Sequence, residues 1–210
     1  MVFPHPKSSN SAAEERRVKR REAIVQVATN LFAKMGYAEC EMEKVAQELG
    51  IAKGTLYLYF KGKEELFLAC VDNGMAQMQK VVRQAAENAP SPMKRIELGI
   101  RAYLTYFDEH PQQAELLIQE RAYFRDRKKP TYFEYRDSGR VAWRELYTTL
   151  QRDGILRSDL PVERILDTIG NVLYGTMFTN FFIGRTVSLD EQVASTLEIL
   201  MRGILKDGEQ

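Results

Sequence analysis

Apolar residues recur at intervals of three and four along almost the whole chain, which is the spacing of one face of an α-helix. Glycine and proline interrupt this pattern, and no stretch alternates between apolar and polar residues for long enough to predict a strand. We therefore expect an all-α protein. The predicted helices span about residues 15–35, 42–49, 52–59, 63–88, 92–109, 111–122, 131–153, 161–183 and 189–206.

The stretch from Met42 to Lys63 has the pattern of two short helices joined by a tight turn. Gly50 can adopt the positive φ that ends the first helix, and Leu56 and Phe60 face inward from the second. The outer face of the second helix is short, cationic and rich in hydroxyl groups, which suits a phosphate backbone and a major groove. These features indicate a helix-turn-helix, although the spacing alone would also fit an ordinary helical corner.

Two segments at a fixed separation, AIVQVATNLFAKMGY and GIAKGTLYLYFKGKEEL, resemble the DNA-binding domain of the TetR family of transcriptional regulators. The resemblance covers roughly residues 17–68. It implies a three-helix DNA-binding head followed by a six-helix body for ligand binding and dimerisation. On this basis we expect a disordered tail over residues 1–13, a helix-turn-helix domain over 14–62, and a ligand-binding and dimerisation domain over 63–210.

The resemblance also implies a function, that of a ligand-responsive, DNA-binding transcriptional regulator. The form we expect is a repressor that a small, partly hydrophobic or aromatic molecule releases from a pseudo-palindromic double-stranded operator, with a second copy of the chain as partner and no cofactor. A helix-turn-helix protein that acts as a protein-interaction adaptor without DNA binding is the alternative. The candidate DNA-binding residues are Lys53, Gly54, Thr55, Tyr57, Tyr59 and Lys63.

The start of the first short helix departs from the TetR pattern. Relatives usually place Thr or Ser there, where this chain has Cys40 and Glu41. Glu41 can still favour the helix N-terminus through the macrodipole, but the hydroxyl cap is missing. Glu43 adds a second carboxylate near the expected DNA surface. We expect these carboxylates to weaken non-specific DNA binding or to point away from the groove.

A run of basic residues, EERRVKRR, precedes the helix-turn-helix and places five cations within Arg16–Arg21. It is either a solvated first helical turn or an arm along DNA phosphates, and the sequence leaves both readings open. Residues 1–63 carry 11 Lys and Arg against 7 Asp and Glu, although the net charge of the whole chain is only +1. This asymmetry is typical of a protein that presents one end to nucleic acid.

Other classes of protein lack support in the sequence. The chain opens with no secretory signal and has no apolar run of about 18 residues, so we expect a cytoplasmic protein. Cys40 and Cys70 lie in no CxxC or Cys/His cluster, so no metal site is expected. His5 and His110 have no helical carboxylate partner, and the GxSxG, GxGxxG and HExxH motifs are absent. We expect no catalytic residues and no enzyme.

Aromatic residues concentrate in the predicted body, since 14 of the 21 lie after residue 100. Each could be an ordinary core residue, but aromatic walls with polar tips also suit a ligand pocket, and TetR relatives commonly hold a small inducer in this body. Asn180 and Arg121 are further polar groups that could orient a ligand. The candidate ligand-binding residues are Tyr103, Phe107, Tyr123, Trp143, Tyr147, Asn171, Tyr174 and Phe178.

The last two predicted helices carry apolar stripes that could pack internally or form a dimer. Gly170 and Gly175 would allow a second helix to approach closely. The family resemblance favours a two-fold, four-helix interface between two copies. The candidate interface residues are Ile165, Ile169, Val172, Leu197, Leu200, Met201 and Ile204.

Overall fold

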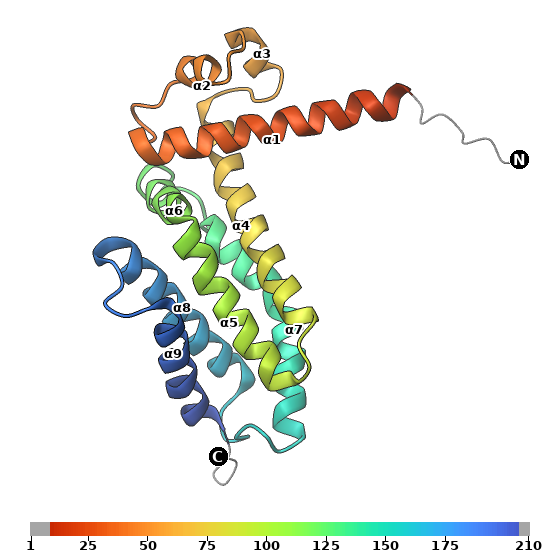
Figure 1. Cartoon of the computed structure of the whole chain (residues 1–210), viewed down its shortest axis with the longest axis vertical. Helices are drawn as coiled ribbons and strands as arrows, with labels where there is room; N and C mark the ends of the chain where they lie inside the picture. The colour runs from red at the N-terminus through yellow and green to blue at the C-terminus, as the bar shows by residue number, and fades with distance from the viewer. Residues whose placement is uncertain (1–8, 206–210) are drawn as a thin grey trace, which may run out of the picture. The chain divides into compact units, whose positions relative to one another are not determined.

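The computed structural model describes residues 9–205, which are helical apart from turns, loops and one isolated bridge between Leu156 and Leu205 (Figure 1). This confirms the all-α prediction. The helices are α1 (Ser9–Met35), α2 (Met42–Glu48), α3 (Lys53–Tyr57), α4 (Lys63–Glu87), α5 (Pro92–Glu109), α6 (Pro111–Tyr123), α7 (Thr131–Arg152), α8 (Val162–Ile183) and α9 (Leu189–Ile204).

The chain divides into two compact units, Met1–Asn73 and Gly74–Gln210. The division falls inside α4, so one uninterrupted helix contributes its first part to the first unit and its second part to the second. The sequence placed the domain boundary earlier, between residues 62 and 63, where α4 begins. The hydrophobic pattern shows where a helix starts but not with which neighbours each of its turns packs.

The first unit is a small helical domain around a core of large apolar side chains. Phe32 from α1 packs edge-to-face on Phe67 from α4, with ring centroids 5.1 Å apart. Leu56 and Phe60 are almost fully buried, as their inward-facing positions predicted. The turn between α2 and α3 depends on Gly50, whose φ of 63° lies in the left-handed region where other residues are strained.

The second unit is a helical bundle in which α5 packs against α6, α8 and α9, and α7 packs against α8. The sequence marks the helix starts clearly. Pro92 and Pro111 occupy first-turn positions, where a missing backbone N–H leaves no helical hydrogen bond unmade. Ser91 and Ser188 cap α5 and α9, because each side chain accepts a hydrogen bond from the N–H three residues later.

Two boundary predictions need correction. The predicted disordered tail is wrong for residues 9–13, which belong to α1, while residues 1–8 lie outside the described residues. Ala12 and Ala13 have high helix propensity and extend the helix backwards from Glu15. The second helix of the helix-turn-helix is also shorter than predicted, because beyond Tyr57 the backbone tightens into a turn in which the N–H of Tyr59 bonds to the carbonyl of Leu56.

Candidate functional site

The α2–turn–α3 segment presents the outer face that the sequence predicted. Leu56 anchors α3 in the core, and this places the opposite side of the helix in solvent. Lys53 and Gly54 are exposed, and Tyr57 is 45% exposed. No Cβ clash would arise at Gly54, where the space around the missing side chain is open. The geometry therefore offers a cationic and hydroxyl-bearing helix to a partner of DNA-like charge.

The two lysines of this face are not free cations. The Lys53 ammonium donates to a Glu43 carboxylate oxygen at 2.7 Å, and this hydrogen bond is the main cause that raises the pKa of Lys53. The carboxylate of Glu43 is exposed and points along the same surface as α3. The sequence expectation left open whether this carboxylate would weaken binding or turn away, and the structure places it directly on the lysine.

Lys63, in the first turn of α4, is held more closely. Its ammonium donates to a Glu41 carboxylate oxygen at 2.8 Å and to the Ala38 carbonyl at 3.0 Å, and it lies 5.1 Å from the centre of the Tyr37 ring. The Lys63 side chain is consequently only 22% exposed. Gly62 precedes the helix and accepts a hydrogen bond from the Leu66 N–H, as expected of an N-terminal cap position.

The basic run in α1 lies on a part of that helix with little packing. Residues 13–23 are exposed on all sides, whereas burial begins at Ile24 and Val25. The Arg21 guanidinium lies 4.8 Å from the centre of the Phe60 ring, which fixes it beside the segment that follows α3. The helix therefore projects as a solvated cationic rod, which is compatible with both readings of the sequence.

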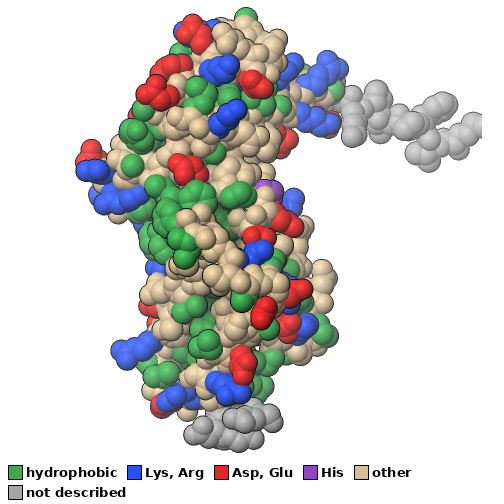
Figure 2. Space-filling model, turned by 60° about the vertical axis from the view of Figure 1, so that its left-hand side comes forward, with side chains coloured by type: hydrophobic (Ala, Val, Ile, Leu, Met, Phe, Trp, Pro, Cys, Tyr) green, Lys and Arg blue, Asp and Glu red, His purple; other side chains and the backbone are tan. Residues whose placement is uncertain are grey.

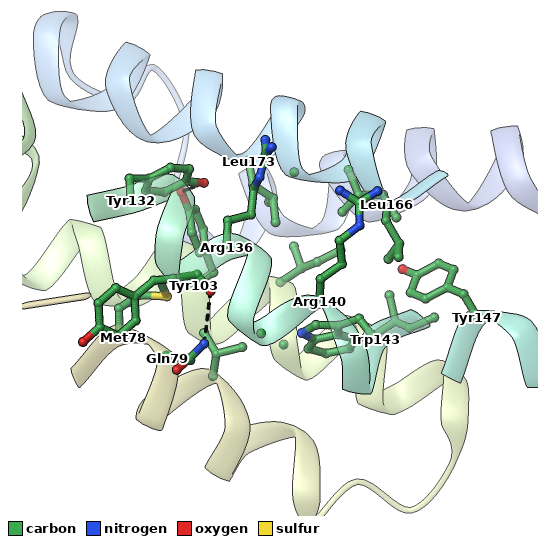
Figure 3. A pocket seen from close by; sticks show the side chains of 18 residues that line it. Met78, Gln79, Tyr103, Tyr132, Arg136, Arg140, Trp143, Tyr147, Leu166 and Leu173 are labelled. Atoms are coloured by element: carbon green, nitrogen blue, oxygen red, sulfur yellow. Dashed lines mark hydrogen bonds between the residues drawn. The ribbon is translucent and has the colours of Figure 1, made fainter. Parts of the chain in front are cut away.

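The second unit contains a cavity of about 160 Å³ between α4, α5, α7 and α8 (Figure 3). Its walls are mainly apolar and aromatic. The Tyr103 and Tyr132 hydroxyls share a hydrogen bond of 3.0 Å at one end, and burial raises the pKa of Tyr132 to about 12. Both hydroxyls thus stay protonated near neutral pH and can donate hydrogen bonds. Trp143 and Tyr147 line the other end.

A family model described as "Bacterial regulatory proteins, tetR family" matches residues 24–70, the helix-turn-helix and the helices around it. Residues 24–70 therefore form a TetR-type helix-turn-helix domain. A further match, 31% identical over 119 residues, is an uncharacterised HTH-type transcriptional regulator, YerO, from Bacillus subtilis (strain 168). The HTH-type transcriptional activator FasR from Mycolicibacterium smegmatis is 30% identical over 107 residues.

These two matches cover 55% and 51% of this chain but only 40% and 48% of the relatives' own lengths. Solved structures cover more of the chain at lower identity. The fatty acid degradation regulator FadR from Bacillus halodurans has a TM-score of 0.74 at 19% identity and covers 87% of this chain and 95% of its own. The ketosteroid transcriptional regulator KstR2 of Mycobacterium tuberculosis has a TM-score of 0.65 at 21% identity and covers 90% of this chain and 96% of its own.

The relatives are named as transcriptional regulators, which agrees with the expectation of a regulator rather than an enzyme. Within residues 9–205, His, Cys, Asp and Glu form no group of three or more that could hold a metal ion. Among the same described residues, no helix has both the length and the apolar character that a membrane span requires.

The structure distributes the predicted ligand residues unevenly. Tyr103, Trp143 and Tyr147 line the cavity. The other five do not. Phe107 packs on Tyr103 and lines a separate, smaller hollow, and Asn171 is exposed on α8. The remaining three are Tyr123, which is 52% exposed at the end of α6, and Tyr174 and Phe178, whose rings pack edge-to-face.

Two polar groups suggested as ligand orienters also have other roles. Asn180 exchanges two hydrogen bonds with Gln192, and Arg121 donates to the carbonyl of Arg125. The lining residues that the sequence missed include Gln79, Arg136 and Arg140. The charged ones gave no signal, because an arginine on an amphipathic helix normally marks its solvated face.

Four predicted interface residues pack inside the protomer. Ile165, Ile169, Leu200 and Ile204 are 2–8% exposed and belong to the core of the second unit. The physical reason is that α8 and α9 each use their most regular apolar stripe against α5 and its neighbours, which the sequence could not distinguish from an outer stripe. Val172, at 39% exposure, stays on the outer face, and Leu197 and Met201 are half-buried.

Apolar residues nevertheless remain on the outside of α8 and α9. The most exposed are Phe182, Ile183 and Ile199, at 63%, 77% and 74%. Figure 2 shows hydrophobic side chains gathered on the face that is turned toward the viewer. Exposed apolar patches of this kind often mark surfaces at which proteins associate.

Proposed function

We propose that the protein is a DNA-binding transcriptional regulator that uses α3 as its recognition helix. The observation that carries this is the paired arrangement of a buried Leu56 and an outward face bearing Lys53, Gly54 and Tyr57 within a TetR-type helix-turn-helix. In such motifs the second helix enters the major groove, and residues at its start reach base edges. Thr55, Tyr59 and Lys63 complete the proposed contact set.

Footprinting tests the proposal. The full-length protein is incubated with DNA from upstream of its own coding sequence, and protected bases are mapped. We expect a protected, pseudo-palindromic site. Lys53→Ala should weaken binding to that site by roughly ten-fold and relax its sequence preference. A protein that protects no DNA at low salt, yet captures a protein partner through α3, would support the adaptor alternative.

We further propose that the protein acts as a homodimer through the outer faces of α8 and α9. A single head binds one half-site, so two heads raise affinity for a palindrome. Gly175 is exposed on α8, and the space where its side chain would lie is open, so a second helix can approach closely there. Light scattering should give the dimer mass at micromolar concentration. Ile199→Glu should give a folded monomer, because a dimer of this variant would bury an unpaired charge in its interface. A monomeric wild-type mass contradicts this.

Repression relieved by a ligand is the regulatory mode we propose. The cavity in the second unit supports it, and α4 supplies the link. Lys63 lies in the first turn of α4, and Met78, Gln79 and Val82, farther along the same helix, line the cavity. From Lys63 to Gln79 is roughly 24 Å of helix at 1.5 Å per residue. A ligand that favours one position of α4 therefore alters the operator-binding end.

Titrations of operator affinity with and without a bound ligand test this coupling, which is typically about 1–3 kcal/mol. A disulfide between α4 and α7 should remove the response while the ligand still binds. A reporter gene under the mapped site then distinguishes repression from activation, because deletion of the regulator raises expression only if it is a repressor. A ligand that binds the cavity and leaves operator affinity unchanged contradicts the mechanism.

A further inference from the structure

The rim of the cavity between α7 and α8 carries an unusual concentration of charge. Arg136 and Arg140, one helical turn apart on α7, both line the cavity and extend toward α8 (Figure 3). The methylene stem of Arg136 passes Gly170 of α8, where an added Cβ would lie 3.6 Å from Arg136 Cδ. Two guanidinium groups therefore lie at the boundary between an apolar interior and solvent.

These two arginines differ in how well they are neutralised. The Arg140 guanidinium bonds to the Asp167 carboxylate at 2.7 Å, to the Glu163 carbonyl at 2.8 Å and pairs with the Glu163 carboxylate at 2.7 Å. Arg136 has the Asp137 carboxylate 3.6 Å from its Nε, outside hydrogen-bond distance, and its guanidinium lies 4.8 Å from the centre of the Phe133 ring. The Nε of Arg136 is buried and has no hydrogen-bond partner among the described residues. The same holds for the Nε of Arg140, but the other two nitrogens of Arg140 are hydrogen-bonded.

The charge balance of the rim leads to the same residue. Asp137 is already hydrogen-bonded to Lys129, and Arg144 shares Glu163 with Arg140. The ion pairs thus form two neighbouring groups. Lys129 and Arg136 share one carboxylate, Asp137, whereas Arg140 and Arg144 have two, Glu163 and Asp167. The cation with the weakest pairing is Arg136. A buried donor without a partner is unfavourable, so an added acceptor at this position is stabilising.

The interior behind Arg136 is apolar and large enough for a ring. An engineered apolar cavity of about 150 Å³ admits benzene, and this one measures about 160 Å³. Gly99 makes part of the room, because an added Cβ there would lie 2.5 Å from the Trp143 ring. The six-membered edge of the indole can therefore approach α5 closely. The Tyr103 and Tyr132 hydroxyls add two polar tips at one end.

We propose that the cavity binds an amphipathic carboxylate, with a ring-sized apolar body among the aromatic walls and its carboxylate on Arg136. This inference rests on the proposed function, because it names the chemical class of the regulatory ligand. Planar guanidinium and carboxylate groups form paired hydrogen bonds, which give direction as well as affinity. Arg140 holds the α7–α8 side of the rim in place through its carboxylate partners.

A matched pair of probes tests the charge requirement. 3-Phenylpropanoate and 3-phenylpropan-1-ol share one carbon skeleton and differ in the carboxylate. Binding is followed by calorimetry and by the fluorescence of Trp143, the single tryptophan of the chain, which lines the cavity. We expect the acid to bind at least about ten-fold more tightly than the alcohol and to change the emission.

Arg136→Met should remove the preference for the acid and leave alcohol binding unchanged, because methionine keeps an apolar stem. Arg136→Gln is a second variant in case the first is unstable. Arg144→Met is the matched control: it removes the same type of charge from the same helix at a position outside the cavity lining, and the acid preference should persist.

Equal binding of acid and alcohol, no binding of the acid at millimolar concentration, or an acid preference that survives in both Arg136 variants overturns the inference. Operator binding by the ligand-free protein is measured in parallel. If it persists while the acid preference fails, only the ligand class is wrong. If the alcohol alone releases DNA, ligand control stands without a carboxylate.

Discussion

The Glu41–Lys63 ion pair predicts that this protein restrains its own affinity for DNA. Glu41→Gln removes the charge 2.8 Å from the Lys63 ammonium and keeps the shape of the side chain. Glu41 is 65% exposed, so the pair is a surface salt bridge worth about 0.2–1 kcal/mol. Lys63 must give up or share this partner to bind a phosphate. The variant should therefore bind DNA about 1.4- to 5-fold more tightly.

The salt dependence gives a sharper readout than the affinity. In the wild type the lysine and carboxylate neutralise each other, so docking of Lys63 releases no additional counterion. In Glu41→Gln the freed lysine contributes one phosphate contact, and the slope of log affinity against log salt should steepen by about 0.9. Fluorescence anisotropy with one duplex between about 50 and 200 mM salt resolves this, because the advantage of the variant should shrink by about 3.5-fold over that range.

Two variants make the test specific. Glu39→Gln removes an exposed carboxylate two residues away that has no ion pair among the described residues, so it controls for loss of general negative charge. Lys63→Ala added to Glu41→Gln should flatten the salt slope by about 0.9, which returns it to the wild-type value, and should abolish the gain in affinity. The reasoning is refuted if Glu39→Gln and Glu41→Gln give the same slope, or if the double variant retains the gain.

Three further outcomes follow from the structure. Gly50→Ala should lower the free energy of unfolding by about 1–2 kcal/mol because φ is 63° there, whereas Gly54→Ala should preserve stability in denaturant titrations yet weaken DNA binding. Glu120→Ala should cost about 1–3 kcal/mol of unfolding free energy, because the buried carboxylate accepts from both the N–H and the hydroxyl of Thr131. The Arg144 hydrogen bond lowers the folded-state pKa of Glu163. The contribution of this ion pair to folding stability is therefore complete above about pH 5 and is lost as pH falls through the lowered pKa. The thermal unfolding temperature between about pH 3 and 6 should depend less on pH in Glu163→Gln.

Most of the secondary structure could be predicted from the sequence, because the residues that start and end helices are easy to recognise in it. Proline at the first turn, serine at N-caps and glycine at helix ends are local signals that tertiary packing did not override. α5, at Pro92–Glu109, agrees with the predicted range. The sequence predicted α3 too long, because the difference between an α-helical turn and a tighter turn at Leu58 depends on packing rather than on local sequence.

The candidate sites were accessible to different degrees. The outward face of α3 could be read from spacing, because only one side of a short helix can be buried. The cavity could not, because its lining is drawn from four helices whose rotation about their axes the sequence does not determine. The same ambiguity misplaced four of the seven predicted interface residues, since an inward and an outward apolar stripe on α8 or α9 look alike until the neighbouring helices are present.

The continuity of α4 has a consequence for anyone who wishes to graft this head onto another body. The boundary between the two compact units falls between Asn73 and Gly74, in the middle of a regular helix. Deleting or adding one residue there rotates everything beyond it by about 100° and shifts it by about 1.5 Å. Hybrid regulators joined at this point should therefore function only at certain insertion lengths, with activity returning near seven residues, or about two turns.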